Sequence, residues 1–224
     1  MAMNRPTVIG VPGQRLGQLR RNELRSTLLH GTATVVLVVI STVVFNQDLG
    51  MFGYIATVAG LVGAGIEGRR ATLSQNKLAR LDAGWRAERK VGKVLRKARV
   101  DVVAHGVVIG RTGDSDHVAL GPCAAVIETK HGHGHVQLRD GALIVRGRRM
   151  PRDPLAQSSR QSELIGRQLR VATTPVLCIV DMTNRPFMAD GVIVCSAADL
   201  NGVLTGLPAV IASGSANRLT DLLR

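Results

Sequence analysis

Two long apolar runs near the N-terminus constrain the fold of this chain more than any other feature. Residues 32–45 read TATVVLVVISTVVF, and the run extends back to residue 28 with only His30 interrupting it. Residues 50–66 read GMFGYIATVAGLVGAGI and carry no charge. A transmembrane helix needs about 20 apolar residues, so each run is close to the minimum spanning length. Residues 28–66 are therefore predicted to form a transmembrane helical hairpin.

The sequence leaves other interpretations of these runs open. They could form a helical hairpin inside a soluble core, and the β-branched residues of the first run are also compatible with a strand. A membrane hairpin is favoured because the chain after Arg69 contains enough apolar segments for a domain of its own. A cleaved signal peptide is disfavoured because a long basic stretch precedes the apolar core. The second run also contains small residues that permit close helix contact: Gly60, Gly63, Ala64 and Gly65.

The charges that flank the two runs predict the orientation of the hairpin. Basic residues lie before the first run and after the second: Arg15, Arg20, Arg21, Arg25, Arg69, Arg70 and Lys77. The connecting segment carries only Asp48. By the positive-inside rule, a two-pass protein of the cell membrane is expected, with both termini and the C-terminal domain in the cytoplasm. The three cysteines, which have no C-x-x-C spacing, fit a reducing compartment.

The excess of basic residues lies mostly after the hairpin. The chain has 29 Lys and Arg against 16 Asp and Glu, and the part before residue 66 holds only 5 of the basic and 2 of the acidic residues. Such a surface could face nucleic acid or lipid head groups, or could simply be a solvated basic surface. With one Trp, one Tyr and three Phe, a base-stacking platform for single strands is not expected.

Four segments are predicted along the chain. They are a basic cytoplasmic N-terminal segment (residues 1–27), the transmembrane hairpin (28–66), a juxtamembrane helix (67–82) and a C-terminal domain (83–224). Helical spacing of apolar residues covers 67–97, 155–169, 197–204 and 216–223. Strands are expected at 100–109, 117–120, 124–130, 142–145, 175–181 and 191–195. This order predicts an α/β fold with a mixed central sheet flanked by helices, preceded by two transmembrane helices.

The stretch VIETK, residues 126–130, carries the chemistry of the C-terminal domain. Residues two apart in a strand point to the same face, so Glu128 and Lys130 are expected to emerge together. Asp116 precedes the neighbouring strand, and a turn at Gly121-Pro122 would bring it close to Glu128. Converging carboxylates bind Mg²⁺ through hard oxygen ligands, and a lysine can position or help to deprotonate a water molecule. Glu88, one helix earlier, could add a third carboxylate or could be an exposed helical residue.

An aspartate followed after about a dozen residues by Glu-x-Lys on a strand resembles the PD-(D/E)XK nuclease superfamily. The segment from residue 83 to the end resembles, more narrowly, its nuclease-related domain (NERD) family. The matching motifs are Ala87-Glu88, where the family favours Gly-Glu, GDSDHVALGP at 113–122, VIETK, and DPLAQ at 153–157. His131, where the family often has Asn, and the alanines at 124 and 125 also depart from the family pattern.

The resemblance implies an active site and a function. The implied catalytic residues are Glu88, Asp116, Glu128, Lys130 and Gln157, with Asp116, Glu128 and Glu88 as ligands of Mg²⁺ or Mn²⁺. The expected protein is a membrane-anchored, cytoplasm-facing nuclease that hydrolyses phosphodiesters of nucleic acid, with DNA favoured by the resemblance. The alternative is a catalytically inactive module, tethered to the membrane, that binds nucleic acid or a protein partner.

Three alternating histidines follow the motif, at His131, His133 and His135. They could bind Zn²⁺ if the segment stayed extended. Because Gly132 and Gly134 favour a turn, the sequence instead predicts an exposed hairpin tip that contacts the phosphate backbone. His117, next to Asp116, is expected to be packed rather than catalytic.

Overall fold

The computed structural model describes residues 5–47, 50–108, 114–210 and 215–221. The chain forms two compact units. Residues 1–15 together with 83–224 make up one unit, called the sheet domain below, and residues 16–82 make up the other, called the hairpin unit.

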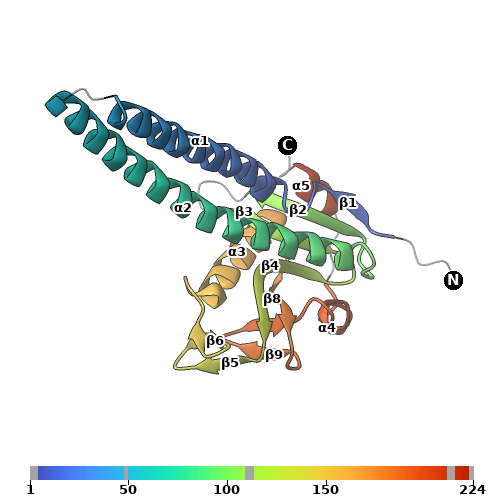
Figure 1. The fold of residues 1–224 in the computed structure, drawn as a ribbon. Helices are drawn as coiled ribbons and strands as arrows, with labels where there is room; N and C mark the ends of the chain where they lie inside the picture. The colour runs from blue at the N-terminus through green and yellow to red at the C-terminus, as the bar shows by residue number, and fades with distance from the viewer. Residues whose placement is uncertain (1–4, 48–49, 109–113, 211–214, 222–224) are drawn as a thin grey trace. The chain divides into compact units, whose positions relative to one another are not determined.

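A mixed β-sheet is the centre of the sheet domain (Figure 1). Within the described residues its strand order is β1-β2-β3-β4-β8-β10-β9. In that order the strands are Thr7–Ile9, Val102–Val108, Asp114–Leu120, Ala124–Gly134, Thr174–Met182, Val192–Cys195 and Phe187–Ala189. The pairs β2·β3, β3·β4 and β9·β10 are antiparallel, whereas β1·β2, β4·β8 and β8·β10 are parallel. The predicted α/β fold with a mixed sheet and flanking helices is confirmed.

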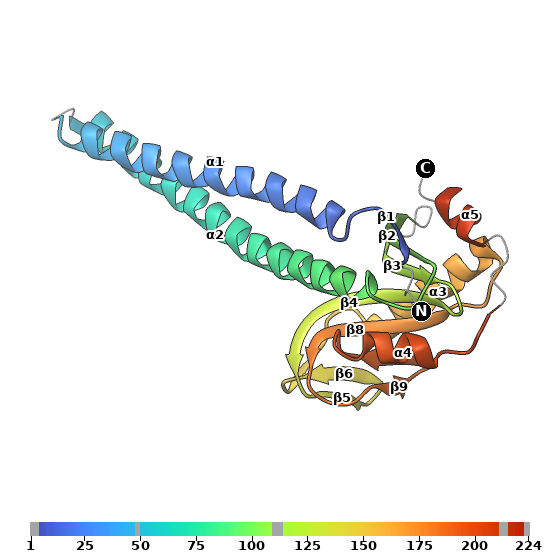
Figure 2. The ribbon, with the colours of Figure 1, turned by 90° about the vertical axis from the view of Figure 1, so that its right-hand side faces the viewer.

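A smaller antiparallel sheet follows β4 along the chain. It consists of β5 (Val136–Arg139), β6 (Ala142–Val145) and β7 (Arg148–Arg149), and it is separate from the main sheet in strand pairing (Figure 2). Val136 and Leu143 of this small sheet join a buried cluster with Leu177 and Ile179 of β8. The small sheet therefore packs on one face of the main sheet near β8.

Helices cover both faces of the main sheet. On one face, the C-terminal part of α2 (Gly50–Leu95) and α4 (Leu200–Gly206) pack on odd-numbered residues of β4, such as Ile127. On the other face, α3 (Pro154–Leu169) and α5 (Ser215–Asp221) pack on even-numbered residues, such as Val126. Successive side chains of a strand point to opposite faces, so β4 is buried on both sides, as its apolar sequence predicts.

The structure contains four strands that the sequence did not predict, β1, β5, β7 and β9, and it extends β4. Residues 7–9 form the edge strand β1, where the sequence indicated only a basic segment. Strand β4 continues to Gly134, so Gly132 lies within a strand rather than in a turn. A Cβ atom at Gly132 would lie 2.9 Å from Cγ2 of Ile179, so this glycine marks a close approach to β8. The expected strand end at Ile109 and helix end at Leu223 lie outside the described residues.

The hairpin unit consists of most of α1 (Gln14–Phe45) and the first part of α2. Both helices are long and apolar enough to cross a membrane, by length and composition. Gly53, Thr57 and Ala64 of α2 and Ser41 of α1 are buried, although most side chains of the apolar runs are exposed. The two helices therefore contact each other through small residues, as predicted for Gly60, Gly63 and Ala64, whereas the predicted contact at Gly65 is absent.

The closest approach of the two helices predicts which glycine matters. A Cβ atom at Gly60 would lie 2.0 Å from Oγ of Ser41, whereas a Cβ atom at Gly65 would meet nothing within 4 Å. Gly60→Leu should therefore destabilise the helix pair by about 1–3 kcal/mol through overpacking. Gly65→Leu should be neutral or slightly stabilising, because leucine has the better helix propensity. Thermal unfolding of the two variants in detergent checks this; equal melting temperatures would contradict the packing.

Candidate active site

Glu128 is a carboxylate buried within β4. Its residue is only 3% exposed, in a strand whose neighbours Val126 and Ile127 belong to the two opposite hydrophobic clusters. Its Oε1 accepts hydrogen bonds from Nζ of Lys130 at 2.6 Å and from Nε2 of Gln157 at 2.7 Å. A buried carboxylate is tolerated when charged and polar donors satisfy it in this way.

Lys130 and Gln157 complete a hydrogen-bonded triangle with Glu128. The Nζ of Lys130 also donates to Oε1 of Gln157 at 3.1 Å. Gln157 is held in the first turn of α3, which begins at Pro154 and is capped by Asp153, whose Oδ1 accepts from the N–H of Ala156 at 3.1 Å. Proline at the first helical position and aspartate before it are typical of helix starts. The DPLAQ motif thus fixes the start of α3, and with it the backbone position from which Gln157 reaches Glu128.

Asp116 lies on β3, next to Glu128. The antiparallel register pairs His117 with Ile127, which places Asp116 opposite Glu128 at the point where the ladder ends. Oδ2 of Asp116 accepts a hydrogen bond from the backbone N–H of Thr129 at 2.7 Å. Burial of its carboxyl group, together with the charges of Glu128 and Glu88, raises the pKa of Asp116 well above its usual range. The predicted convergence across the turn is present in the structure.

Glu88 joins this cluster from α2. Burial, together with the negative charges of Asp114 and Glu128, raises the pKa of Glu88 to about 7. A hydrogen bond from the backbone N–H of Gly13 and the charge of Lys130 act in the opposite direction. Glu88 is thus part of a group of repelling carboxylates and not an independent surface residue of the helix.

Two contributors to the cluster were not predicted from the sequence. The negative charge of Asp114 raises the pKa of Glu88, and Asp114 forms an ion pair with Arg15 at 2.5 Å. It lies two residues before Asp116 on the same strand, so period-two spacing was a signal that could have found it. Gly13 reaches Glu88 from the N-terminal segment, and no local sequence pattern indicates that contact.

The three alternating histidines lie on and just after an extended strand, and not at a hairpin tip. His131 and His133 are exposed on the last part of β4, and His135 is exposed between β4 and β5. The predicted hairpin tip at 132–134 is therefore wrong; the strand ends at Gly134, whose φ is +95°.

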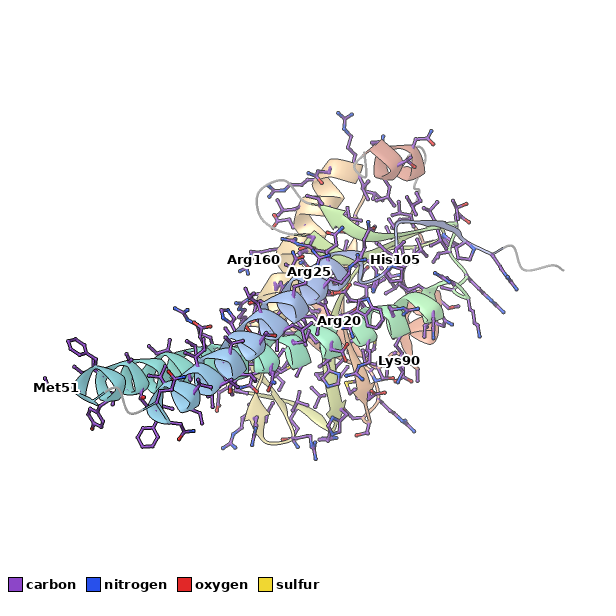
Figure 3. The ribbon with its side chains drawn as sticks, turned by 45° about the horizontal axis from the view of Figure 1, so that its top comes forward. Arg20, Arg25, Met51, Lys90, His105 and Arg160 are labelled. Carbon is purple, nitrogen blue, oxygen red and sulfur yellow. The ribbon has the colours of Figure 1, made fainter. Side chains whose placement is uncertain are left out.

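His117 is fully buried, and its Nδ1 lies 2.7 Å from Nδ1 of His105, which is labelled in Figure 3. Burial lowers the pKa of both rings, that of His105 to about 4. Both imidazoles are therefore neutral near pH 7, and one donates to the other. This agrees with the expectation that His117 is packed.

One carboxylate oxygen of the cluster has no hydrogen-bond partner and could bind a divalent cation. Oε2 of Glu128 is buried and has no hydrogen-bond partner in the part of the chain that the structure describes. A buried acceptor left unpaired costs about 1–3 kcal/mol, and a cation would remove that cost. Over the same residues, however, no group of three His, Cys, Asp or Glu side chains is arranged to hold a metal ion. Glu128 and Asp116, with Glu88, are the residues that could hold one after side-chain rearrangement.

The comparisons with known proteins agree with this geometry. Residues 83–182 match the family model of the nuclease-related domain, NERD. The match runs from the C-terminal part of α2 to the end of β8 and includes all five candidate site residues. No curated protein and no solved structure matches the chain. The chain therefore contains a nuclease-related domain.

The raised pKa of Glu88 predicts a pH dependence of stability. Its folded pKa of about 7 lies above the usual 4.5. The folded state therefore binds the proton more tightly, and this stabilisation is complete below pH 4.5 and is lost as the pH rises through 7. The difference is at most about 3 kcal/mol, reduced by solvent screening. Glu88→Gln should flatten the decline in thermal stability of the metal-free chain across this range.

The control for this measurement is Glu163→Gln. Glu163 lies on α3 with a side chain that is 61% exposed and paired to Arg167. That variant should keep the wild-type pH dependence. A wild-type profile that does not change between pH 5 and 8, or one that Glu88→Gln leaves unaltered, would contradict the burial of this carboxyl group.

Proposed function

We propose that the sheet domain is a metal-dependent phosphodiester hydrolase acting on nucleic acid, with DNA as the expected substrate. The observation that carries this proposal is the triangle of Glu128, Lys130 and Gln157 beside Asp116, within a nuclease-related domain. In such a site the barrier is lowered mainly by positioning and by stabilising charge on the phosphate.

The carboxylates are the proposed ligands of Mg²⁺ or Mn²⁺. Glu128 would contribute its unpaired Oε2, and Asp116 and Glu88 would contribute oxygens whose pKa values are raised by burial and by the neighbouring negative charges. Mg²⁺ binds carboxylate oxygens and would supply Lewis-acid stabilisation of charge on the scissile phosphate. A bound cation would also favour the ionised forms of both raised carboxyls, so the pH dependence described above should weaken when Mg²⁺ is added.

Lys130 is the proposed group that contacts the reacting atoms. Its ammonium is held by Glu128 and Gln157, so it can donate a third hydrogen bond to a phosphate oxygen or to the attacking water. Gln157 donates to Glu128 and accepts from Lys130, and so fixes both side chains at once. We assign Gln157 a positioning role.

Exposed arginines around the small sheet are the proposed contacts for the phosphate backbone. Arg146 contacts His133 near the end of β4, and the others lie on the small sheet or in the segment before α3: Arg139, Arg148, Arg149 and Arg152. Such contacts bind nucleic acid without reading its sequence and make the affinity dependent on salt.

The second candidate function is a binding module that does not cleave. It is favoured by the fact that Lys130 and Gln157 already hold Oε1 of Glu128 and that the described residues contain no assembled three-ligand metal group. Ala87, in the position where the resemblance favours glycine, is buried, so it also tightens the packing beside Glu88. This module would bind nucleic acid in a salt-dependent manner and release it unchanged.

Cleavage assays on the purified full chain separate these two functions. Incubation with plasmid, linear and single-stranded DNA should give products with Mg²⁺ or Mn²⁺ and none with a chelator. Glu128→Gln and Lys130→Ala should each lower the rate by about a hundredfold or more, as expected when a charge-stabilising group is removed.

Asp140→Asn is the matched control, because Asp140 has a side chain that is 93% exposed and lies outside the cluster. Cleavage that survives both active-site substitutions would overturn the assignment. Binding without cleavage under both metals would establish the second candidate function instead.

We further propose that the hairpin unit anchors the protein in the cell membrane. Only 6% of the apolar window of α1 and 17% of that of α2 are buried, whereas a core helix of a soluble domain is mostly buried. The sheet constrains the topology: β1 precedes the hairpin, β2 follows it, and the two strands pair. A sheet cannot be divided by a bilayer, so both flanks must lie on one side, and the flanking cations favour the cytoplasm.

Membrane fractionation tests the anchor. The full chain should remain in the membrane pellet after high-salt and carbonate washes. Val39→Arg combined with Leu61→Arg should release much of it, since each charge at a helix centre costs about 2.5–3.5 kcal/mol of insertion free energy. Leu73→Arg, at an exposed position of α2 beyond the apolar run, is the control and should not. Release of the unaltered chain by salt alone would show peripheral binding.

A further inference from the structure

A cationic groove lies in the sheet domain, separate from the carboxylate cluster. It has a volume of about 710 Å³ and is formed by the N-terminal segment, the C-terminal part of α2 and the start of α4. Its basic lining residues come from the N-terminal segment, from α2 and from the turn that follows α2: Arg5, Lys90, Lys93, Arg96 and Lys97. No acidic residue is among its lining residues.

The charge of the groove is largely uncompensated. Lys90, labelled in Figure 3, pairs with Asp181, which lies at the end of β8. The other four cations form no ion pair with any residue that the structure describes. The C-terminal end of α2 contributes only about half a negative charge, which is small beside four cations. The groove is therefore a site that attracts a multiply charged anion.

The uncharged lining residues of the groove favour a ligand larger than an inorganic ion. Pro6, Val8, Val94 and Ala198 provide apolar surface, and Asn201 provides an amide. The volume lies in the range of small-molecule sites, about 300–1,000 Å³. No aromatic residue lines the groove, so stacking of a ring does not contribute to binding.

We propose that this groove binds an organic phosphate of nucleotide size that carries two or more phosphate groups. A phosphate monoester carries about −1.5 to −2 charges near pH 7, so two such groups would balance the four unpaired cations. The uncharged body of the ligand would contact Val8 and Val94. The same chemistry is found in soluble nucleotides and in phosphorylated lipid head groups. The proposal does not depend on the hydrolase function, because it uses none of the carboxylate cluster.

Calorimetric titration of the full chain in neutral-lipid nanodiscs tests the groove. The probes are pyrophosphate, ADP, ATP and a short-chain phosphatidylinositol bisphosphate, each added in the presence of a chelator so that no metal contributes. At least one of the three organic probes should bind, and pyrophosphate should bind more weakly. Preference for the nucleotides or for the lipid identifies the source of the ligand, and either result supports the proposal.

Charge reversal locates the binding. Lys93 lies in the last turn of α2 and Lys97 in the turn that follows it, and both are exposed, so Lys93→Glu with Lys97→Glu should leave the fold intact. That variant should weaken binding by about a hundredfold, since each charge-assisted hydrogen bond is worth roughly tenfold or more. Arg160→Glu with Arg185→Glu makes the same change of charge at two exposed positions, on α3 and between β8 and β9, and should alter binding less than about twofold.

Three results would overturn the proposal. One is the absence of binding by all the organic probes. Another is equal loss of binding in the two charge-reversal variants. The third is competition by oligonucleotides alone, which would make the groove a surface for a polynucleotide. If the organic phosphates bind but no DNA is cleaved, the groove stands and the hydrolase proposal fails, so the two proposals are separable.

Discussion

The burial of one carboxylate, Glu128, is the constraint on which the rest of the sheet domain depends. An isolated buried charge is too costly to keep, so the fold must supply donors to it. Lys130 comes from the same strand two residues later, and Gln157 comes from a helix that has to begin at a defined position. The start of α3 at Pro154 and its capping by Asp153 thus place a hydrogen-bond donor, Gln157, beside the buried charge of Glu128. Loss of either donor would leave a charge in the core that the folded state could not easily accommodate.

The central part of the candidate site could be predicted because it depends on short-range geometry. The period of a strand puts Glu128 and Lys130 on one face, and a tight turn at Gly121 brings Asp116 across to them. The position of Gln157 followed from the family resemblance rather than from spacing. The mixed sheet was predictable from the order of apolar segments. These features can be predicted because each depends on a local sequence pattern or on a single turn.

The parts that escaped prediction depend on contacts between distant residues. β1 has a short, unremarkable sequence and becomes a strand only because β2 offers it an edge. Gly132 has the local signature of a turn, yet it is a glycine because Ile179 leaves no room for a side chain. Gly13 reaches Glu88 although the whole hairpin unit separates the two residues in the sequence. In each case the residue type reflects a neighbour that the local sequence does not reveal.

The pairing of β1 with β2 has a consequence for how the protein is made. Thr7 leaves the ribosome long before Val102, its partner in the sheet, and the whole of the hairpin unit is synthesised between them. β1 therefore stays unpaired until both apolar helices and β2 have been translated. Because such distant pairing is slow, the N-terminal strand is expected to be the last to join during folding. A nascent chain stalled before β2 would expose that strand, without its partner, to chaperones or to aggregation.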